Sequence, residues 1–414
     1  MIPAPPLTTG TSGLYSCSMT ALKPIYFDNN ATTSVAPEVL EAMMPFLTDL
    51  YGNPSSMHAF GGQASTYIKE AREKVAAFIN AEPSEIIFTS CGTESDNMAI
   101  HGSAEVLGTQ AKVITSRVEH PAVLGSCRRL RDMGMRVIEL SVDRLGHLDM
   151  DAYREALKRN SPAIVSIMWA NNETGVIFPM QKIAEMAKEA GAIMHTDAVQ
   201  TAGKIPIDVK KLPVDMLSIS GHKLHAPKGV GVFYLRRGTR LKTFMLGGHQ
   251  EHGRRGGTEN VPYIVGMGRA VELAACNMAE ESRLLTRLRD KLENGLLAAC
   301  PDASVNGDPA ARLPNTSNIS FEYIEGEAIL CHLSDLGICA STGSACAAGS
   351  LEPSHVIRAM GVPFTAVHGS IRFSLSRYNT EAEVDYVLEH TPRIIKKLRD
   401  LSPFGKDNAP PVAL

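Results

Sequence analysis

The sequence lacks long apolar runs and paired cysteines, and both absences exclude classes of protein. None of its apolar stretches approaches the roughly 18 residues that a membrane-spanning helix needs. Its eight cysteines are scattered and show no Cys-x-x-Cys spacing. This pattern argues against a structural zinc site and a disulfide framework, and for a reducing cytosol. We therefore expect a cytoplasmic protein with no membrane segment and no metal site.

An excess of charge of one sign is also missing. The net charge of -3 and the pI near 6.5 give no electrostatic reason to expect nucleic acid or an anionic membrane as a partner. The chain has 414 residues, of which 44% are hydrophobic and 21% are charged, close to the average for globular proteins. This length is sufficient for two domains with sizeable cores.

The two ends lack the patterns of ordered structure. Residues 1–22 are rich in Pro, Ser, Thr and Gly, and they have neither the basic start nor the apolar core of a signal peptide. We predict a disordered tail there, in which Met19 is an alternative translation start. Residues 405–414 are predicted to be similarly loose.

Between the ends, short β-rich runs alternate with helical patterns, such as those over 67–79 and 180–190. Seven runs are predicted as buried strands, at 86–90, 112–116, 136–140, 164–168, 192–196, 216–220 and 231–235. This alternation predicts an α/β fold with a mainly parallel seven-stranded sheet, which binds ligands at the carboxyl ends of its strands.

The pattern changes after about residue 275. A long charged helix over 280–299 leads into strands at 316–321 and 371–376 and a final helix over 381–398. We therefore expect a large domain over 33–274 and a smaller α+β domain formed by 23–32 and 275–404.

Lys223 is the most informative residue of the chain. It follows the strand-like run 214–219 and is placed by Gly221 and His222 at the end of a buried strand. That position suits a Schiff base with a carbonyl cofactor. The alternative is a lysine that extends from a loop into solvent.

A phosphate site is predicted where Gly92 and Thr93 turn from a strand into a helix. Free amides, the helix dipole and a hydroxyl together favour phosphate binding. His222 is a further candidate phosphate contact, because it adjoins Lys223. The same run is also typical of an ordinary helix N-cap, and Cys91 before it is interpreted as a packing residue.

Four polar residues are predicted to contact the ring of the cofactor. Asp197 follows a strand and could pair with a protonated pyridine nitrogen, or it could cap the next helix. Gln200 and Asn172 could bond the phenolic oxygen. His120 also follows a strand and could stack on the ring and transfer protons, although a lone histidine is often structural.

Two further residues suggest the chemistry of the substrate. Cys346 lies in a run of small residues over 340–350 that predicts a mobile loop, whereas Cys276 and Cys300 fall in helical patterns and are expected in the core. An accessible thiol suits a nucleophile, with an incidental surface cysteine as the alternative. Arg372 has apolar neighbours on a strand, so it requires an anionic partner, either a substrate carboxylate or a structural ion pair.

Together these motifs resemble the cysteine desulfurases, the NifS/IscS group of fold-type I pyridoxal phosphate enzymes. The resemblance extends from about residue 25 to 403, and the residues within the motifs are most similar to those of the NifS branch. It rests on Asp28-Asn-Asn-Ala-Thr-Thr33, Gly52-Asn-Pro-Ser55, Asn171-Asn-Glu-Thr-Gly175, Asp197-Ala-Val-Gln200, Ser220-Gly-His-Lys223, Gly256-Gly-Thr-Glu-Asn260, Gly343-Ser-Ala-Cys346 and Arg372. The chain departs from the family pattern in its N-terminal extension and at Ala347-Ala348, where hydroxyl residues are common.

The resemblance implies a role for each site residue. Lys223 would hold pyridoxal 5'-phosphate, Asp197 its ring nitrogen, and Gln200 and His120 its ring. The phosphate would be bound by Gly92, Thr93, Ser220 and His222, with Thr258 supplied by the partner subunit of a homodimer. Arg372 and Asn172 would position the substrate.

The reaction implied is the conversion of L-cysteine to L-alanine, with the sulfur carried as a persulfide on Cys346. A scaffold protein of the NifU/IscU type would accept the sulfur for iron–sulfur cluster assembly, in the first instance for nitrogenase. A housekeeping desulfurase of the IscS type, a selenocysteine lyase or general aminotransferase, and a non-enzymatic binding protein are the alternatives. The combined presence of the catalytic residues argues against the last of these.

Overall fold

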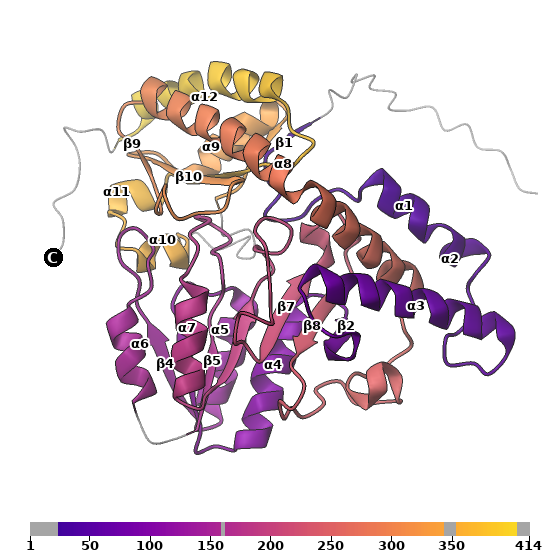
Figure 1. Cartoon of the computed structure of the whole chain (residues 1–414). Coiled ribbons are helices and arrows are strands. Elements are labelled where there is room, and N and C mark those ends of the chain that lie inside the picture. Colours follow the sequence, from indigo (N-terminus) through magenta and orange to yellow (C-terminus); the bar gives the residue numbers. More distant parts are fainter. Residues whose placement is uncertain (1–23, 159–161, 343–352, 404–414) are drawn as a thin grey trace, which may run out of the picture.

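The computed structural model describes residues 24–158, 162–342 and 353–403. A large α/β part contains a seven-stranded sheet, and a smaller part lies against its upper edge in the view of Figure 1. The strands of the large sheet lie in the order β2 (Ile86–Thr89), β8 (Gly231–Leu235), β7 (Met216–Ser220), β6 (Ile193–Asp197), β5 (Ala163–Ser166), β3 (Lys112–Ser116) and β4 (Arg136–Leu140). Only β8 runs antiparallel to its neighbours, so the prediction of a mainly parallel sheet is confirmed.

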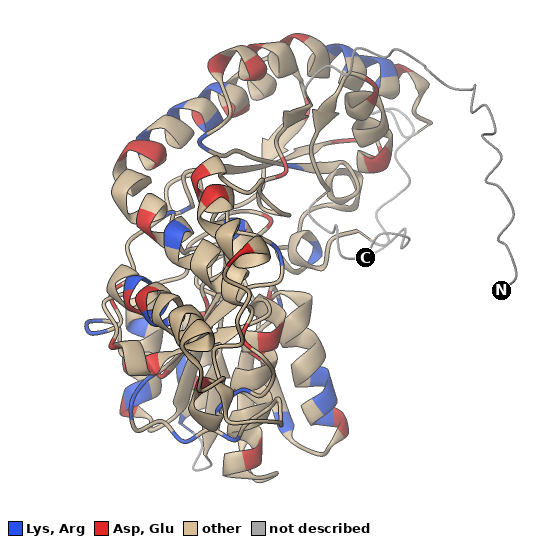
Figure 2. Cartoon of the chain, turned by 90° about the vertical axis from the view of Figure 1, so that its right-hand side faces the viewer, with Lys and Arg blue, Asp and Glu red and all other residues tan. Residues whose placement is uncertain are grey.

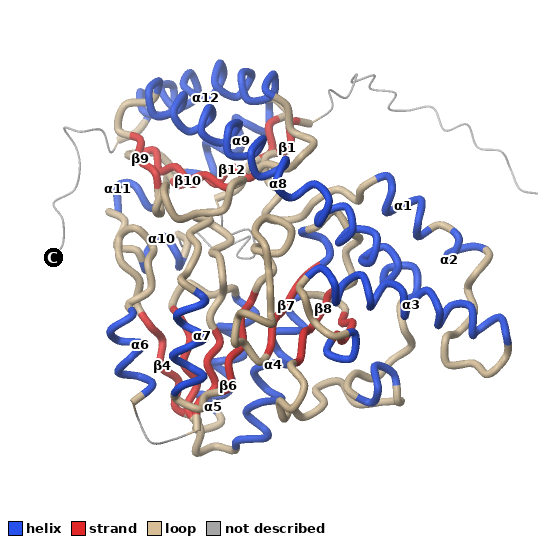
Figure 3. Tube along the Cα trace, viewed as in Figure 1, coloured by secondary structure: helices blue, strands red, loops and turns tan. Residues whose placement is uncertain are grey.

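Helices cover both faces of this sheet (Figure 3). One face packs against α4 (Gly92–Leu107) and α5 (Pro121–Asp132). The other face belongs to the largest core, to which α1 (Pro37–Met43), α3 (Ala59–Phe78), α7 (Met180–Glu189) and the first half of α8 (Val261–Ala299) contribute. The short helices α2 (Pro45–Thr48) and α6 (Met150–Leu157) complete this part.

The smaller part is built on two short sheets. The strands β12 (Ser370–Ser374), β10 (Thr316–Phe321) and β9 (Ala303–Val305) pair antiparallel, and β1 (Ile25–Tyr26) pairs with β11 (Ile338–Cys339). The helices α9 (Gly326–Asp335), α10 (His355–Ala359), α11 (Phe364–Val367) and α12 (Glu381–Leu401) pack around them. The β1–β11 pairing brings the start of the described chain into this part.

Two helices are longer than the sequence predicts. The long charged helix starts at Val261 instead of residue 280, and α3 starts at Ala59. The first half of α8 has no charged stripe because it is buried against other helices. At Gly268 a Cβ atom would lie 2.9 Å from the Cβ of Ala71, so the close approach of α8 to α3 requires glycine.

The two hydrophobic cores meet along α8. Ala274 belongs to the large core, whereas Leu285, further along the same helix, belongs to the small core. The expectation of a buried cysteine holds for Cys300 but is wrong for Cys276, which is exposed between the two cores. In the parts of the chain that the structure describes, no helix has both the length and the apolar character for crossing a membrane.

Candidate functional site

A pocket opens at the carboxyl ends of β5, β6 and β7, where the small part covers the large sheet. Its volume of about 440 Å³ lies in the range that small-molecule sites occupy. Every predicted site residue except Cys346 and Thr258 lines it, namely Gly92, Thr93, His120, Asn172, Asp197, Gln200, Ser220, His222, Lys223 and Arg372. The fold therefore brings together residues that lie up to 280 positions apart in the sequence (92 to 372).

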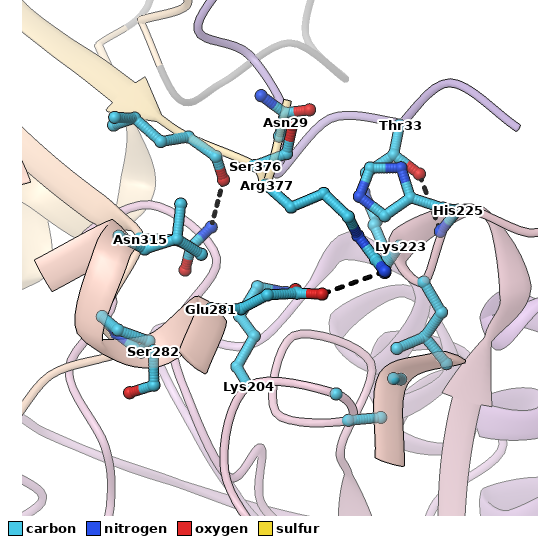
Figure 4. A pocket seen from close by; sticks show the side chains of 17 residues that line it. Asn29, Thr33, Lys204, Lys223, His225, Glu281, Ser282, Asn315, Ser376 and Arg377 are labelled. Atoms are coloured by element: carbon cyan, nitrogen blue, oxygen red, sulfur yellow. Dashed lines mark hydrogen bonds and ion pairs between the residues drawn. The ribbon is translucent and has the colours of Figure 1, made fainter. Parts of the chain in front are cut away.

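Lys223 ends the short turn that follows β7, and its side chain reaches across to the N-terminal segment. Its Nζ donates hydrogen bonds to the backbone oxygens of Asn30 and of Ala31, the latter at 2.6 Å. On its far side lies a second, small cavity, in which Arg377 pairs with Glu281 at 2.9 Å beside Lys204 (Figure 4). The lysine thus separates the main pocket from a charged cavity between the two parts of the molecule.

Asp197 is the last residue of β6 and is buried at the floor of the pocket. Burial raises its pKa to about 6, although a 2.8 Å hydrogen bond from the Val199 amide and the charge of Lys223 oppose this rise. The carboxylate does accept a backbone amide bond, as the capping alternative expects, but the residues after it form a turn instead of a helix. A cationic ring nitrogen beside it would compensate its buried charge.

The start of α4 leaves space for a phosphate group, because Gly92 has no side chain. A Cβ atom on Gly92 would lie 2.8 Å from Cγ2 of Val199 and 3.5 Å from Cβ of Ser220. The first amides of a helix have no partner within the helix and favour an anion. Among the described residues, Oγ of Ser220 and Oε1 of Gln200 are buried without a hydrogen-bond partner. The helix amides and the Ser220 hydroxyl are donors that fit the phosphate of pyridoxal phosphate, and the Gln200 amide oxygen is an acceptor that fits a protonated phenolic oxygen.

Two of the histidines that line the pocket, His120 and His222, are neutral. Burial, with smaller effects of Lys223 and His355, lowers the pKa of His120 to about 4. Its Nδ1 accepts the Ala122 amide at 3.1 Å and caps α5, so the proton of the ring is on Nε2. Burial and the charge of Lys223 likewise lower the pKa of His222 to about 4. His120 therefore has a structural role in addition to its position in the pocket.

Arg372 lies on β12 and joins the small part to the pocket. It is only 2% exposed, and it donates to Asp28 at 2.7 Å and to the backbone oxygen of Asn172 at 3.0 Å. Its Nε has no hydrogen-bond partner among the described residues. The structural ion pair is present, and Arg372 also lines the pocket, so the substrate-carboxylate alternative stays a prediction.

Cys346 lies outside the described residues, but the residues on both sides of its segment lie beside the pocket. Ser341 exchanges backbone hydrogen bonds with Arg372, at 3.2 and 2.6 Å. On the other side, Ser354 donates to Glu173 at 2.5 Å, and Nε2 of His355 lies 2.9 Å from the backbone oxygen of Glu119. The undescribed residues 343–352 therefore connect two anchors at the pocket.

Thr258 does not line the Lys223 pocket. It is exposed and borders a separate hollow with Ser90 and Arg255. Its predicted contact with the phosphate requires a second subunit, which a single chain cannot test.

The sequence does not single out several residues that the fold places in the pocket. Asp96, Glu173 and His355 line it, and so does Cys91, whose interpretation as a packing residue is wrong. Asn30 contributes its backbone oxygen to Lys223. Asn30 and Glu173 lie in two motifs of the family resemblance, so the sequence could have identified them. No local pattern indicates that Asp96 faces the pocket.

Comparisons with known proteins give one consistent result. A family model of the class-V aminotransferases matches residues 25–387. A protein of Trichormus azollae named cysteine desulfurase is 58% identical over 385 residues, covering 93% of this chain and 96% of the relative. Cysteine desulfurase NifS of Azotobacter vinelandii is 55% identical over 387 residues, with the same coverage of 93% and 96%.

Solved structures agree with these sequence matches. A NifS-like protein superposes with a TM-score of 0.85 at 41% identity, over 91% of this chain and all (100%) of the other. A structure of SspA in complex with cysteine gives a TM-score of 0.76 at 36% identity, over 86% of this chain and 100% of the other.

Proposed function

The chain belongs to the class-V aminotransferases and, within them, to the pyridoxal phosphate-dependent cysteine desulfurases, and from this premise we propose that it supplies sulfur for iron–sulfur clusters through a persulfide on Cys346. The observation that supports this proposal is the anchoring of the Cys346 segment at both ends beside the Lys223 pocket. The two anchors limit how far the connecting residues can extend from the pocket.

Different residues of the pocket would bind the cofactor and the substrate. Lys223 would hold pyridoxal phosphate, with Gly92, Thr93 and Ser220 around its phosphate and Asp197 at its ring nitrogen. When bound, the cofactor supplies an electron sink for the bonds at the substrate's α-carbon. Arg372 binds the α-carboxylate of cysteine, because its Nε has no partner in the described residues. The α-carboxylate competes with Asp28 for the guanidinium group.

The sulfur transfer is a displacement at the sulfur atom of cysteine. The Cys346 thiolate attacks this sulfur, the new S–S bond forms as the carbon–sulfur bond breaks, and the released electron pair stays with the carbon fragment. Uptake of a proton at that carbon yields L-alanine, and the sulfur remains on Cys346 as a persulfide. Neutral His120, with its ring proton on Nε2, is the nearby group that can exchange protons during this step.

Replacing Cys346 by alanine tests the proposal. Cys346→Ala should bind cofactor normally and still change its visible absorbance on addition of cysteine, yet release no alanine above background. Cys276→Ala is the matched control, because Cys276 is an exposed thiol that lies outside the pocket. Alanine release at the normal rate from Cys346→Ala would disprove the persulfide route.

The destination of the sulfur is proposed from the NifS branch. The similarity to NifS of Azotobacter vinelandii favours nitrogenase clusters, with a scaffold of the NifU/IscU type as the acceptor. Deletion of the gene should lower nitrogenase activity more than that of housekeeping iron–sulfur enzymes. An equal loss of both activities would assign the housekeeping role instead.

A further inference from the structure

A second buried aspartate lines the cofactor pocket and has no role in the chemistry above. Asp96 lies on α4 and is 1% exposed. Its Oδ1 has no hydrogen-bond partner among the described residues, and Nε2 of His195 lies 3.7 Å away. An ionised carboxylate in such a position is costly, because it has lost water without gaining a compensating donor at that oxygen.

A chain of buried hydrogen bonds on the strands beneath the pocket passes close to Asp96. Oγ of Ser166 lies 2.9 Å from Nδ1 of His195, and Nε2 of His195 lies 2.9 Å from Oγ of Ser218. The Ser218 hydroxyl also acts on Asp96, where it opposes the rise of the carboxyl pKa. Burial lowers the pKa of His195 to about 3, so the imidazole is neutral and brings no positive charge to Asp96.

The remaining groups that act most strongly on the pKa of Asp96 are acidic. Burial raises the pKa of Asp96 well above its usual value, and the charge of Asp197 on β6 is the next largest cause. Glu119, which follows β3, and Cys91, which precedes α4, act in the same direction, whereas only the Ser218 hydroxyl opposes them. The neighbours that act most strongly on Asp96 thus include no cation.

We propose that Asp96 and Asp197 form a carboxyl pair at the ring end of the pocket, in which Asp96 keeps its proton and Asp197 carries the single negative charge. The proposal rests on the proposed placing of the cofactor's ring nitrogen at Asp197. One ring nitrogen can compensate one carboxylate, and a second ionised carboxylate would remain buried without a partner. Asp96 is therefore a positioning residue, whose neutral carboxyl group leaves a single negative charge in the pair.

Asparagine at position 96 imitates a protonated aspartate, and this makes the proposal testable. In the cofactor-bound full chain, Asp96→Asn should weaken cofactor binding by less than about tenfold, whereas Asp197→Asn should weaken it by more than about a hundredfold. Infrared difference spectra, wild type minus Asp96→Asn, should show at neutral pH the carbonyl stretch of a protonated carboxylic acid. Absence of this band, or equal losses of binding in the two variants, would overturn the proposal. Asp96→Ser provides the same spectral comparison if Asp96→Asn folds poorly.

The pH dependence of stability gives an independent test. A carboxyl whose pKa is raised by folding keeps a proton that the unfolded chain has lost, so its contribution to stability declines as pH rises from the unfolded towards the folded pKa. Asp96→Asn removes this decline and should melt above the wild type at pH 8, with a flatter pH slope. Destabilisation by Asp96→Asn at pH 8 would mean that Asp96 is ionised.

Glu293→Gln is the matched control for both measurements. Glu293 is also buried, but it accepts two bonds from Arg312, at 2.5 and 2.7 Å, and although burial opposes them these bonds lower its pKa. Glu293→Gln should therefore lose stability at pH 8 and leave the infrared band in place. The infrared and stability measurements do not depend on cysteine turnover. A negative result in them would therefore disprove the carboxyl pair without disproving the proposed function.

Discussion

At the scale of single residues, two lysines are candidates for the residue that binds the cofactor covalently. Lys223 lines both the main pocket and the small cavity behind it, and Lys204 lines only the latter. Burial lowers the pKa of Lys204 to about 8, which also makes it a reactive amine. Proximity to the phosphate cradle at Gly92 and Ser220 favours Lys223.

We predict that borohydride reduction of the yellow protein places the cofactor on Lys223. Peptide mapping of the reduced chain should find it there, and Lys223→Ala should be colourless. Lys204→Met should keep the colour, because this residue faces the other cavity. Recovery of the reduced cofactor on Lys204 would contradict the assignment.

Arg372 gives a second prediction at the residue scale. Arg372→Lys keeps the charge but loses the planar set of donors, so kcat/KM for cysteine should fall roughly 10- to 100-fold, equivalent to about 1.5–3 kcal/mol. Steady-state kinetics of alanine release measure this change. Arg393→Lys, at a side chain that is 71% exposed, is the control and should leave the kinetics unchanged. An unaltered kcat/KM in Arg372→Lys would restrict Arg372 to its ion pair with Asp28.

At the scale of elements, α10 holds one end of the Cys346 segment. The helix has only five residues and depends on its N-cap, Ser354, whose hydroxyl accepts the amides of Val356 and Ile357 and donates to Glu173. The cap thus stabilises the helix and ties it to the loop after β5.

We predict that Ser354→Ala lowers stability by about 1 kcal/mol, the usual effect of a lost cap, and slows sulfur transfer to Cys346 without loss of cofactor. Thermal melting and single-turnover alanine release measure the two effects. Thr380→Ala removes the capping box of α12 and is the matched control. It should cost similar stability but leave turnover unchanged, and equal kinetics in both variants would contradict an anchoring role for Ser354.

At the scale of the whole molecule, the large part carries exposed hydrophobic side chains at two places. They are Leu40, Met44, Leu47, Tyr51 and Met57 on and after α1 and α2, and Phe244, Met245 and Leu246 in the loop after β8. Figure 2 faces the side on which α1 and α2 lie in Figure 1. Such exposed apolar groups are typical of a subunit interface, and Thr258 is exposed in the segment that follows residue 246.

We predict a homodimer that buries these apolar side chains and supplies Thr258 to the partner's phosphate site. Leu47→Asp should shift the protein towards monomer in analytical ultracentrifugation and weaken cofactor binding, because each site then loses the partner's threonine. Leu401→Asp, an exposed leucine at the end of α12, should do neither. A fully active monomer at nanomolar concentration would refute the shared site.

The sequence by itself determined the elements and the chemical groups of this protein. Periodicity located β3, β4, β7, β8 and β10 to the residue, because a buried strand is a short apolar run with clear ends. It missed the starts of α3 and α8, where glycines and burial on several sides remove the helical pattern. The motifs likewise identified Lys223, Asp197 and Arg372 as groups that need particular partners.

Only the tertiary structure decided which groups meet. The Arg372–Asp28 pair, the bonds from Lys223 to the segment at Asn30 and the two anchors of the Cys346 segment join positions far apart in the chain. Asp96 is the clearest case, since on the sequence it is one of several acids at the start of a helix. Its acidic neighbours include Asp197 on β6 and Glu119 in the loop after β3, and local sequence contains no information on that packing.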